Sequence, residues 1–77
     1  ANIAVAPSFR RKGAANALLG YLEGEAKKRG VERIFLEVRV SNAPAMRLYL
    51  SRGYVGRYVR PRYYGDGEDA VIFVKEL

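Results

Sequence analysis

The first nineteen residues constrain the fold more than any other part of the chain. A short apolar run, Ile3–Ala6, ends at Pro7, and the basic turn Arg10-Arg11-Lys12-Gly13 follows it. Small and apolar residues then continue into Leu18 and Leu19 at helical spacing. This order predicts a strand, a basic turn and a helix that begins directly after the turn.

Such a junction is suited to binding an anion. The free N–H groups of a helix's first turn point at one spot, and the positive end of the helix dipole lies there too. The basic run 10–12 adds fixed positive charge, and Gly13 lets the backbone approach a bulky ligand. The junction predicts a pyrophosphate cradle, and a solvated basic loop is the alternative. Its spacing matches neither the Walker A loop nor the dinucleotide fingerprint, because both need more glycines.

The remaining sequence alternates between helical and strand patterns. The first strand is expected over Ala1–Ala6. The later elements are expected as a helix over Gly13–Arg29, a strand over Ile34–Val40, a helix over Ala45–Ser51, and strands over Tyr54–Tyr58 and Ala70–Lys75. The order is β-α-β-α-β-β, which predicts an α/β fold with a mixed sheet of α+β character. The first two strands should pair in parallel and the last two should form a hairpin.

Local signals support these boundaries. Leu18, Leu19, Leu22 and Ala26 recur at helical spacing, and Gly30 is a natural residue to end that helix. Ile34, Leu36, Val38 and Val40 share one face of the second strand, and Phe35, Glu37 and Arg39 share the other. Asn42 is a good N-cap, Pro44 suits a first helical turn, and Gly53 marks the helix end.

Composition limits the possible chemistry. The 77 residues suffice for one domain, and there is no cysteine and no histidine. This excludes disulfides, thiolate nucleophiles and the commonest metal ligand, so no metal is expected. No apolar run approaches the roughly 20 residues that span a bilayer, so we expect a cytoplasmic protein without a membrane partner.

The net charge of +6 comes from 14 Lys and Arg residues against 8 Asp and Glu residues. Part of it lies in Arg57, Arg60 and Arg62, which alternate with tyrosines. Such a pattern can stack on single-stranded nucleic acid and neutralise it, although nucleic acid is not the partner we expect.

Several motifs resemble one protein family. The run 10–15, Arg-Arg-Lys-Gly-Ala-Ala, fits the Gln/Arg-x-x-Gly-x-Gly/Ala signature of the GNAT acetyl-CoA-dependent N-acetyltransferases. The segments 36–42 and 45–54 and the run 63–70 are similar to the protein N-terminal acetyltransferases. These include the bacterial ribosomal-protein alanine acetyltransferases and their archaeal relatives, and the resemblance covers nearly the whole chain.

The resemblance implies transfer of an acetyl group from acetyl-CoA to the alpha-amine of a protein N-terminus. It implies Glu37 as the catalytic base and Tyr49, twelve residues later, as the catalytic acid. A solvent-facing strand residue and a buried core aromatic are the respective alternatives. The alternatives for the whole function are a GNAT enzyme acting on a small amine or a lysine, and a non-catalytic basic binding or dimerising half-domain.

The resemblance also assigns binding residues. Those for acetyl-CoA are Ile3, Ala4, Val5, Arg10, Arg11, Lys12, Gly13, Ala14, Ala15, Asn16 and Asn42. Tyr63 and Tyr64 would line the groove for the peptide N-terminus, with a hydrophobic hairpin tip as the alternative. Glu68 and Asp69 could attract the substrate amine, although a solvated turn explains them equally.

The family fold has about twice this length. We therefore expect residues 1–77 to be the C-terminal half of the acetyltransferase domain, with the family's N-terminal half absent. The first strand would then leave one edge uncovered, and an exposed edge invites pairing with a second copy of the chain, giving a homodimer.

Overall fold

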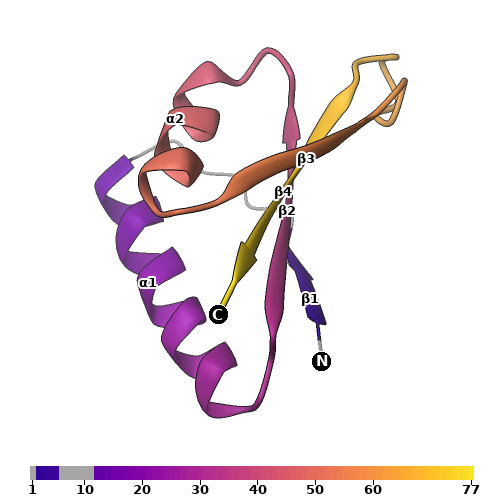
Figure 1. Cartoon of the computed structure of the whole chain (residues 1–77). Helices are drawn as coiled ribbons and strands as arrows, with labels where there is room; N and C mark the ends of the chain where they lie inside the picture. Colours follow the sequence, from indigo (N-terminus) through magenta and orange to yellow (C-terminus); the bar gives the residue numbers. More distant parts are fainter. Residues whose placement is uncertain (1, 6–11) are drawn as a thin grey trace.

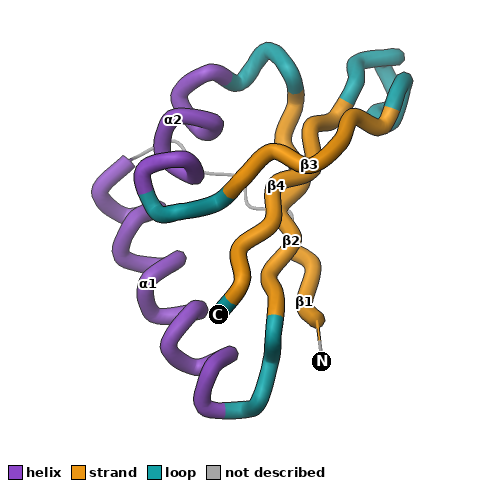
Figure 2. The backbone as a smooth tube through the Cα atoms, in the orientation of Figure 1, coloured by secondary structure: helices purple, strands orange, loops and turns teal. Residues whose placement is uncertain are grey.

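The computed structural model describes residues 2–5 and 12–77, arranged as one mixed sheet with two helices (Figures 1 and 2). The elements in chain order are β1 (Asn2–Val5), α1 (Lys12–Lys28), β2 (Arg33–Arg39), α2 (Ala43–Ser51), β3 (Val55–Arg60) and β4 (Ala70–Glu76). The predicted order β-α-β-α-β-β is confirmed, and the predicted boundaries of the later elements are close to those observed. The expected ends of the first strand, Ala1 and Ala6, lie outside the described residues. No helix among these residues is long and apolar enough to cross a membrane.

The strands lie in the order β1-β2-β4-β3. The parallel pairing of β1 with β2 and the β3–β4 hairpin are both as predicted. β4 inserts between β2 and β3 and runs antiparallel to both. β1 and β3 are therefore the two edges, and every residue of β3 is exposed.

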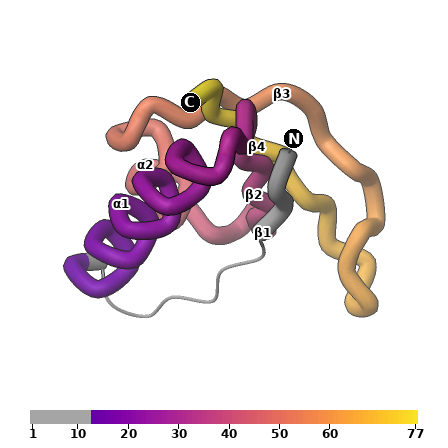
Figure 3. Tube along the Cα trace, turned by 90° about the horizontal axis from the view of Figure 1, so that it is seen from below, coloured from indigo at the N-terminus to yellow at the C-terminus, as the bar shows by residue number. Residues whose placement is uncertain are grey.

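Both helices cover the same face of the sheet (Figure 3). The core on this face joins Leu19 of α1 and Tyr49 of α2 to Ile34, Leu36 and Val38 of β2. The side-chain alternation predicted for β2 is thus confirmed over Ile34–Val38. Val40 was expected on the same face, but it is 41% exposed because β2 ends at Arg39.

The buried stripe of α1 differs in part from the expected one. Leu19 and Ala26 are buried, whereas Leu18 is 52% exposed. The stripe begins instead at Ala15, which is fully buried, and it includes the carboxylate of Glu23. Ala15, Leu19 and Glu23 lie at intervals of four positions, so they share one helix face.

Capping residues lie at the helix boundaries, as predicted. The Asn42 side chain accepts a hydrogen bond from the Ala45 N–H at 3.2 Å, which caps the start of α2, and Pro44 lies in its first turn. Gly30 and Gly53 have φ of +77° and +91°, where side chains are strained, and each follows the end of a helix.

Candidate functional site

The face of the sheet opposite the helices carries Glu37. We call it the second face: Phe35, Glu37 and Arg39 of β2 are paired there with Val74, Ile72 and Ala70 of β4. Glu37 points to this face because its neighbours Leu36 and Val38 point into the helix-covered core. A half-buried carboxylate among apolar strand residues needs a hydrogen-bond partner.

Tyr63 supplies that partner. Its hydroxyl donates a hydrogen bond to the Glu37 carboxylate at 2.7 Å. The pKa of Tyr63 is raised, and the hydrogen bond to Glu37 is the largest cause. The positive charge of Arg60 offsets part of that rise. Arg60 therefore lies close enough to act on this pair electrostatically, and Tyr63 fixes the orientation of the carboxylate.

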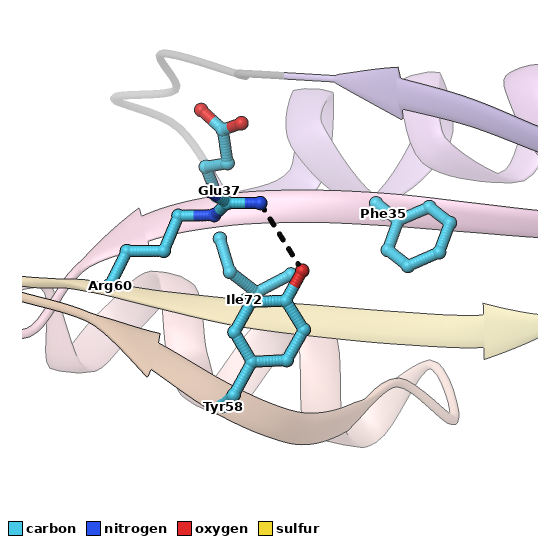
Figure 4. Close-up of a pocket in the computed structure, with 5 residues that line it drawn as sticks. All are labelled: Phe35, Glu37, Tyr58, Arg60 and Ile72. Carbon is cyan, nitrogen blue, oxygen red and sulfur yellow. Dashed lines mark hydrogen bonds between the residues drawn. The ribbon is translucent and has the colours of Figure 1, made fainter. Parts of the chain in front are cut away.

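Glu37 also lines a shallow pocket of about 240 Å³ on the second face (Figure 4). Its other lining residues are Phe35, Tyr58, Arg60 and Ile72. The close-up shows the Arg60 side chain extending from β3 across β4 toward β2. The pocket thus combines an apolar floor, one carboxylate and one guanidinium.

Side-chain contacts hold the tip of the β3–β4 hairpin over the end of β2. The Arg39 guanidinium donates to Asp66 at 2.7 Å and lies 4.1 Å from the centre of the Tyr64 ring. The Ser41 hydroxyl donates to Glu68 at 2.8 Å. These contacts place Tyr63 and Tyr64, whose rings meet edge to face with centroids 5.2 Å apart, beside Glu37.

The two acidic residues considered for the substrate amine already have partners in this hairpin. Glu68 accepts from Ser41, and Asp69 accepts from the Arg62 backbone N–H at 2.8 Å. Arg62 has φ of 50°, so the Asp69 contact stabilises a conformation that a non-glycine residue adopts at a cost. Both carboxylates help to shape the hairpin.

Tyr49 lies on the other side of the sheet from Glu37. It is 1% exposed and packs against Tyr54 and Phe73, with ring centroids 6.0 and 5.8 Å away. Burial raises the pKa of Tyr49 to about 12, and the nearby Tyr64 adds to this rise. Its phenol therefore keeps its proton at neutral pH. No contact among the described residues joins Tyr49 directly to Glu37, although Tyr64 interacts electrostatically with both.

The expected cofactor cradle lies partly outside the described residues, since Arg10 and Arg11 are not among them. Ile3, Ala4 and Val5 form β1, and the run 12–16 is the first turn of α1. A side chain added at Gly13 would meet no atom within 4 Å, so the space beside this turn is open in the described structure.

Among the other residues expected at the cradle, Asn16 and Asn42 already have hydrogen-bond partners for their side chains. The methyl group of Ala15 is fully buried, whereas Ala14 is exposed. The Asn16 amide oxygen accepts from Arg52 at 2.7 Å, and the Asn42 side chain caps α2. No group of three or more acidic side chains that could hold a metal ion occurs within residues 2–5 and 12–77.

A buried ionic cluster was not anticipated from the sequence. The Glu23 carboxylate, 8% exposed as a residue, accepts from Arg52 at 2.7 Å, from the Tyr54 hydroxyl at 2.8 Å and from Lys75 at 3.1 Å. Burial alone would raise the pKa of Glu23, but these three hydrogen bonds outweigh it and hold the pKa below its ordinary value. The sequence feature that could have predicted this cluster is a carboxylate, Glu23, on the same helix face as the apolar Leu19. The cations that pair with Glu23 lie 29 and 52 residues further along the chain.

Comparison with known proteins identifies a family that this chain matches. Residues 1–54 match the model of the acetyltransferase (GNAT) family. The chain is 50% identical over 74 residues to the ribosomal protein bS18-alanine N-acetyltransferase of Escherichia coli K12, which covers 92% of this chain and 50% of that protein. It is 42% identical over 77 residues to the N-alpha-acetyltransferase of Saccharolobus solfataricus, which covers 99% of this chain and 46% of that protein.

The solved structures agree with the fold. The crystal structure of Ard1 from Thermoplasma volcanium superposes with a TM-score of 0.87 at 26% identity, over 96% of this chain and 53% of that one. The chain spans about half the length of the curated relatives it matches. Since the family model covers 54 of the 77 residues and a relative that is 50% identical covers 92% of this chain, the chain belongs to the acetyltransferase (GNAT) family.

Proposed function

We propose that this chain is the C-terminal half of a cytoplasmic enzyme that transfers an acetyl group from acetyl-CoA to the alpha-amine of a protein N-terminus. The observation that carries the proposal is the Glu37 carboxylate, oriented by the Tyr63 hydroxyl at 2.7 Å beside a pocket on the second face. The names of the bacterial and archaeal relatives support the N-terminal alpha-amine as the acceptor.

The reaction needs a base, because a protein's alpha-amine has a pKa near 8 and attacks only when neutral. Glu37 takes the amine proton, directly or through one water. The neutral amine nitrogen then forms a bond to the thioester carbonyl carbon, and the carbon–sulfur bond breaks.

Tyr49 lies on the other side of the sheet from Glu37 and keeps its proton at neutral pH. The family resemblance assigns it as the acid that would give this proton to the leaving sulfur as negative charge develops there. The second proton that the nitrogen loses as the amide forms passes through water to the Tyr49 phenolate, and Glu37 releases its proton to solvent.

Tyr63 and Tyr64 act at the acceptor side of this reaction. Tyr63 is hydrogen-bonded to Glu37, and Tyr64 is held by the Arg39 guanidinium stacked 4.1 Å from its ring centre. Rigid aromatic side chains at a hairpin tip offer contact area at low entropic cost. They would form one wall of the groove for the first residues of the acceptor peptide.

The binding residues for acetyl-CoA would lie at the other end of the site. The N–H groups at the start of α1, including those of Lys12, Gly13, Ala14, Ala15 and Asn16, would receive the pyrophosphate, with Arg10 and Arg11 adding charge. The backbone of Ile3, Ala4 and Val5 would pair with the pantetheine arm in the manner of an added strand. Asn42 would contact the same arm through the face of its side chain that does not cap α2.

Gly13→Asp tests this placement. We expect it to weaken coenzyme A binding at least about 100-fold, because a carboxylate would clash with the pyrophosphate and repel it. The new side chain enters open space, and a negative charge in the first turn favours the helix, so folding should not suffer. Isothermal titration calorimetry measures the affinity.

Gly24→Asp is the matched control for that test. Gly24 lies on the same helix, and a side chain there also meets nothing within 4 Å. Its affinity for coenzyme A should stay within about twofold of wild type. Unchanged affinity in Gly13→Asp would contradict the placement of the pyrophosphate.

The isolated 77-residue chain should self-associate or fold only in part. Among the described strands β1 is an edge of the sheet, and the backbone groups on its outer side can pair with a second chain. We therefore expect sedimentation equilibrium to show a dimer joined near β1, or circular dichroism to show incomplete structure, with weak acetyl transfer in either case. A stable monomer with dispersed amide signals and full turnover would contradict this.

A further inference from the structure

Arg60 places a positive charge in the pocket that holds Glu37. Its guanidinium donates a hydrogen bond to the Tyr58 hydroxyl at 3.4 Å and lies 5.5 Å from the centre of the Tyr58 ring. In contrast, Arg33, Arg39 and Arg52 each form an ion pair of 2.7 to 2.8 Å with a carboxylate. Arg60 has no such pair among the ion pairs of residues 2–5 and 12–77, so the donors that do not bond Tyr58 are available to a ligand in the pocket.

The shape of the pocket limits what could use those donors. At about 240 Å³ it is smaller than the 300–1,000 Å³ typical of complete small-molecule sites, so it holds only part of an acceptor. Phe35 and Ile72 supply an apolar floor, while Glu37 and Arg60 supply opposite charges. An acceptor that fits must bring an amine to Glu37 and can bring an anion to Arg60.

We infer that Arg60 is a specificity-determining residue that favours acceptors with a carboxylate close to the reacting amine. The inference rests on the proposed function, because it takes the Glu37 pocket as the acceptor site. A guanidinium presents several N–H donors in a planar fork that matches a carboxylate. Its hydrogen bond and cation–π contact to Tyr58 limit the freedom that would be lost on binding, which makes it a better receptor than a free surface arginine.

Two kinds of acceptor share this chemistry. One is a protein N-terminus with aspartate or glutamate as its second residue. The other is a free amino acid, whose own alpha-carboxylate lies beside the amine. A lysine at the second position would instead meet Arg60 as a like charge, which disfavours binding.

The experiment compares amidated peptides that differ only at the second residue: Ala-Glu-Ala-Ala, Ala-Gln-Ala-Ala and Ala-Lys-Ala-Ala. Free glutamate is the fourth acceptor. Acetylation is measured as kcat/KM in the full-length protein that carries this chain, in wild type, Arg60→Met and Arg60→Glu. Arg57→Met is the matched control, because Arg57 is exposed on the same strand but does not line this pocket.

We expect wild type to prefer the glutamate peptide over the glutamine peptide by about fivefold, the factor that about 1 kcal/mol from one ion pair supplies. Arg60→Met should abolish the preference, and Arg60→Glu should favour the lysine peptide. Arg57→Met should behave as wild type. If free glutamate were acetylated fast and no peptide were acetylated, Arg60 would still recognise a carboxylate, and that carboxylate would be the one of a free amino acid. The proposed N-terminal substrate would then be overturned.

Other outcomes overturn the inference. Equal acetylation of the three peptides by wild type would remove the role of Arg60 and leave the proposed function standing. An equal loss of preference in Arg57→Met and Arg60→Met would show a diffuse basic field and contradict a pocket residue. If no acceptor were acetylated, the proposed function and the inference would fall together.

Discussion

Tyr49→Phe should lower turnover by about 10²- to 10⁴-fold while coenzyme A affinity stays within about twofold, the range expected when a general acid is lost. The substitution removes only a hydroxyl. The ring contacts with Tyr54 and Phe73 remain, so the core should keep its packing. A proton donor acts mainly in the transition state, so kcat and kcat/KM should fall together.

The partner variant is Glu37→Gln, which keeps the shape of the side chain and removes the base. It should lower turnover by a similar factor and change the pH dependence of kcat/KM, since a glutamine cannot accept the amine proton. Stopped-flow or thiol-release assays on the full-length protein that carries this chain measure both variants. Tyr21→Phe, at a tyrosine 68% exposed on α1, is the matched control and should keep the wild-type rate.

Wild-type rates in both variants would place the acid and base elsewhere. A loss confined to Glu37→Gln would keep the base and remove the proton-donor role from Tyr49, leaving it as a core aromatic.

Tyr63→Phe separates the orientation of the Glu37 carboxylate from proton transfer. It breaks the 2.7 Å hydrogen bond to Glu37 but leaves the carboxylate in place, so it should lower kcat less than Glu37→Gln does.

Glu23→Gln should lower the free energy of unfolding by about 2–3 kcal/mol at pH 7, just below the roughly 3–5 kcal/mol that breaking a fully buried ion pair costs. The Glu23 side chain is 10% exposed, and its partners Arg52 and Lys75 are 22% and 26% exposed. The variant leaves both cations without their anion in a poorly solvated place. In a domain of this size the melting temperature should fall by roughly 10–20 °C.

The control for this prediction is Glu25→Gln on the same helix. Glu25 pairs with Lys28 at 3.7 Å, and the Lys28 side chain is 76% exposed. Removing that surface pair should cost under about 0.5 kcal/mol. Urea unfolding followed by circular dichroism measures both variants, and equal stabilities would show that the Glu23 cluster contributes no net stability.

The stability of wild type should depend on Glu23 at acid pH. Its pKa is lower in the folded state than in the unfolded chain, where the ordinary value near 4.3 applies. Its contribution is therefore complete above that ordinary value and is lost as the pH falls through the lowered one. The free energy of unfolding of Glu23→Gln should lack this part of the acid dependence.

The sequence alone determined the order of the elements and the faces of β2. Alternating side chains put Ile34, Leu36 and Val38 on one face and Glu37 on the other, and this period-two pattern is local. Asn42 and Gly30 marked helix boundaries for equally local reasons, a capped N–H group and a positive φ. The resemblance of short motifs added the family, which the comparison with known proteins confirmed.

Only the tertiary structure decided which side chains meet. Tyr63 reaches Glu37 across 26 residues because β4 inserts between β2 and β3, and Arg39 holds the hairpin tip in place. The Glu23 cluster arises because α1, the C-cap residue of α2 and β4 bring their charges to one buried point. Hydrogen bonds between distant residues depend on strand order and register, and no local period encodes either.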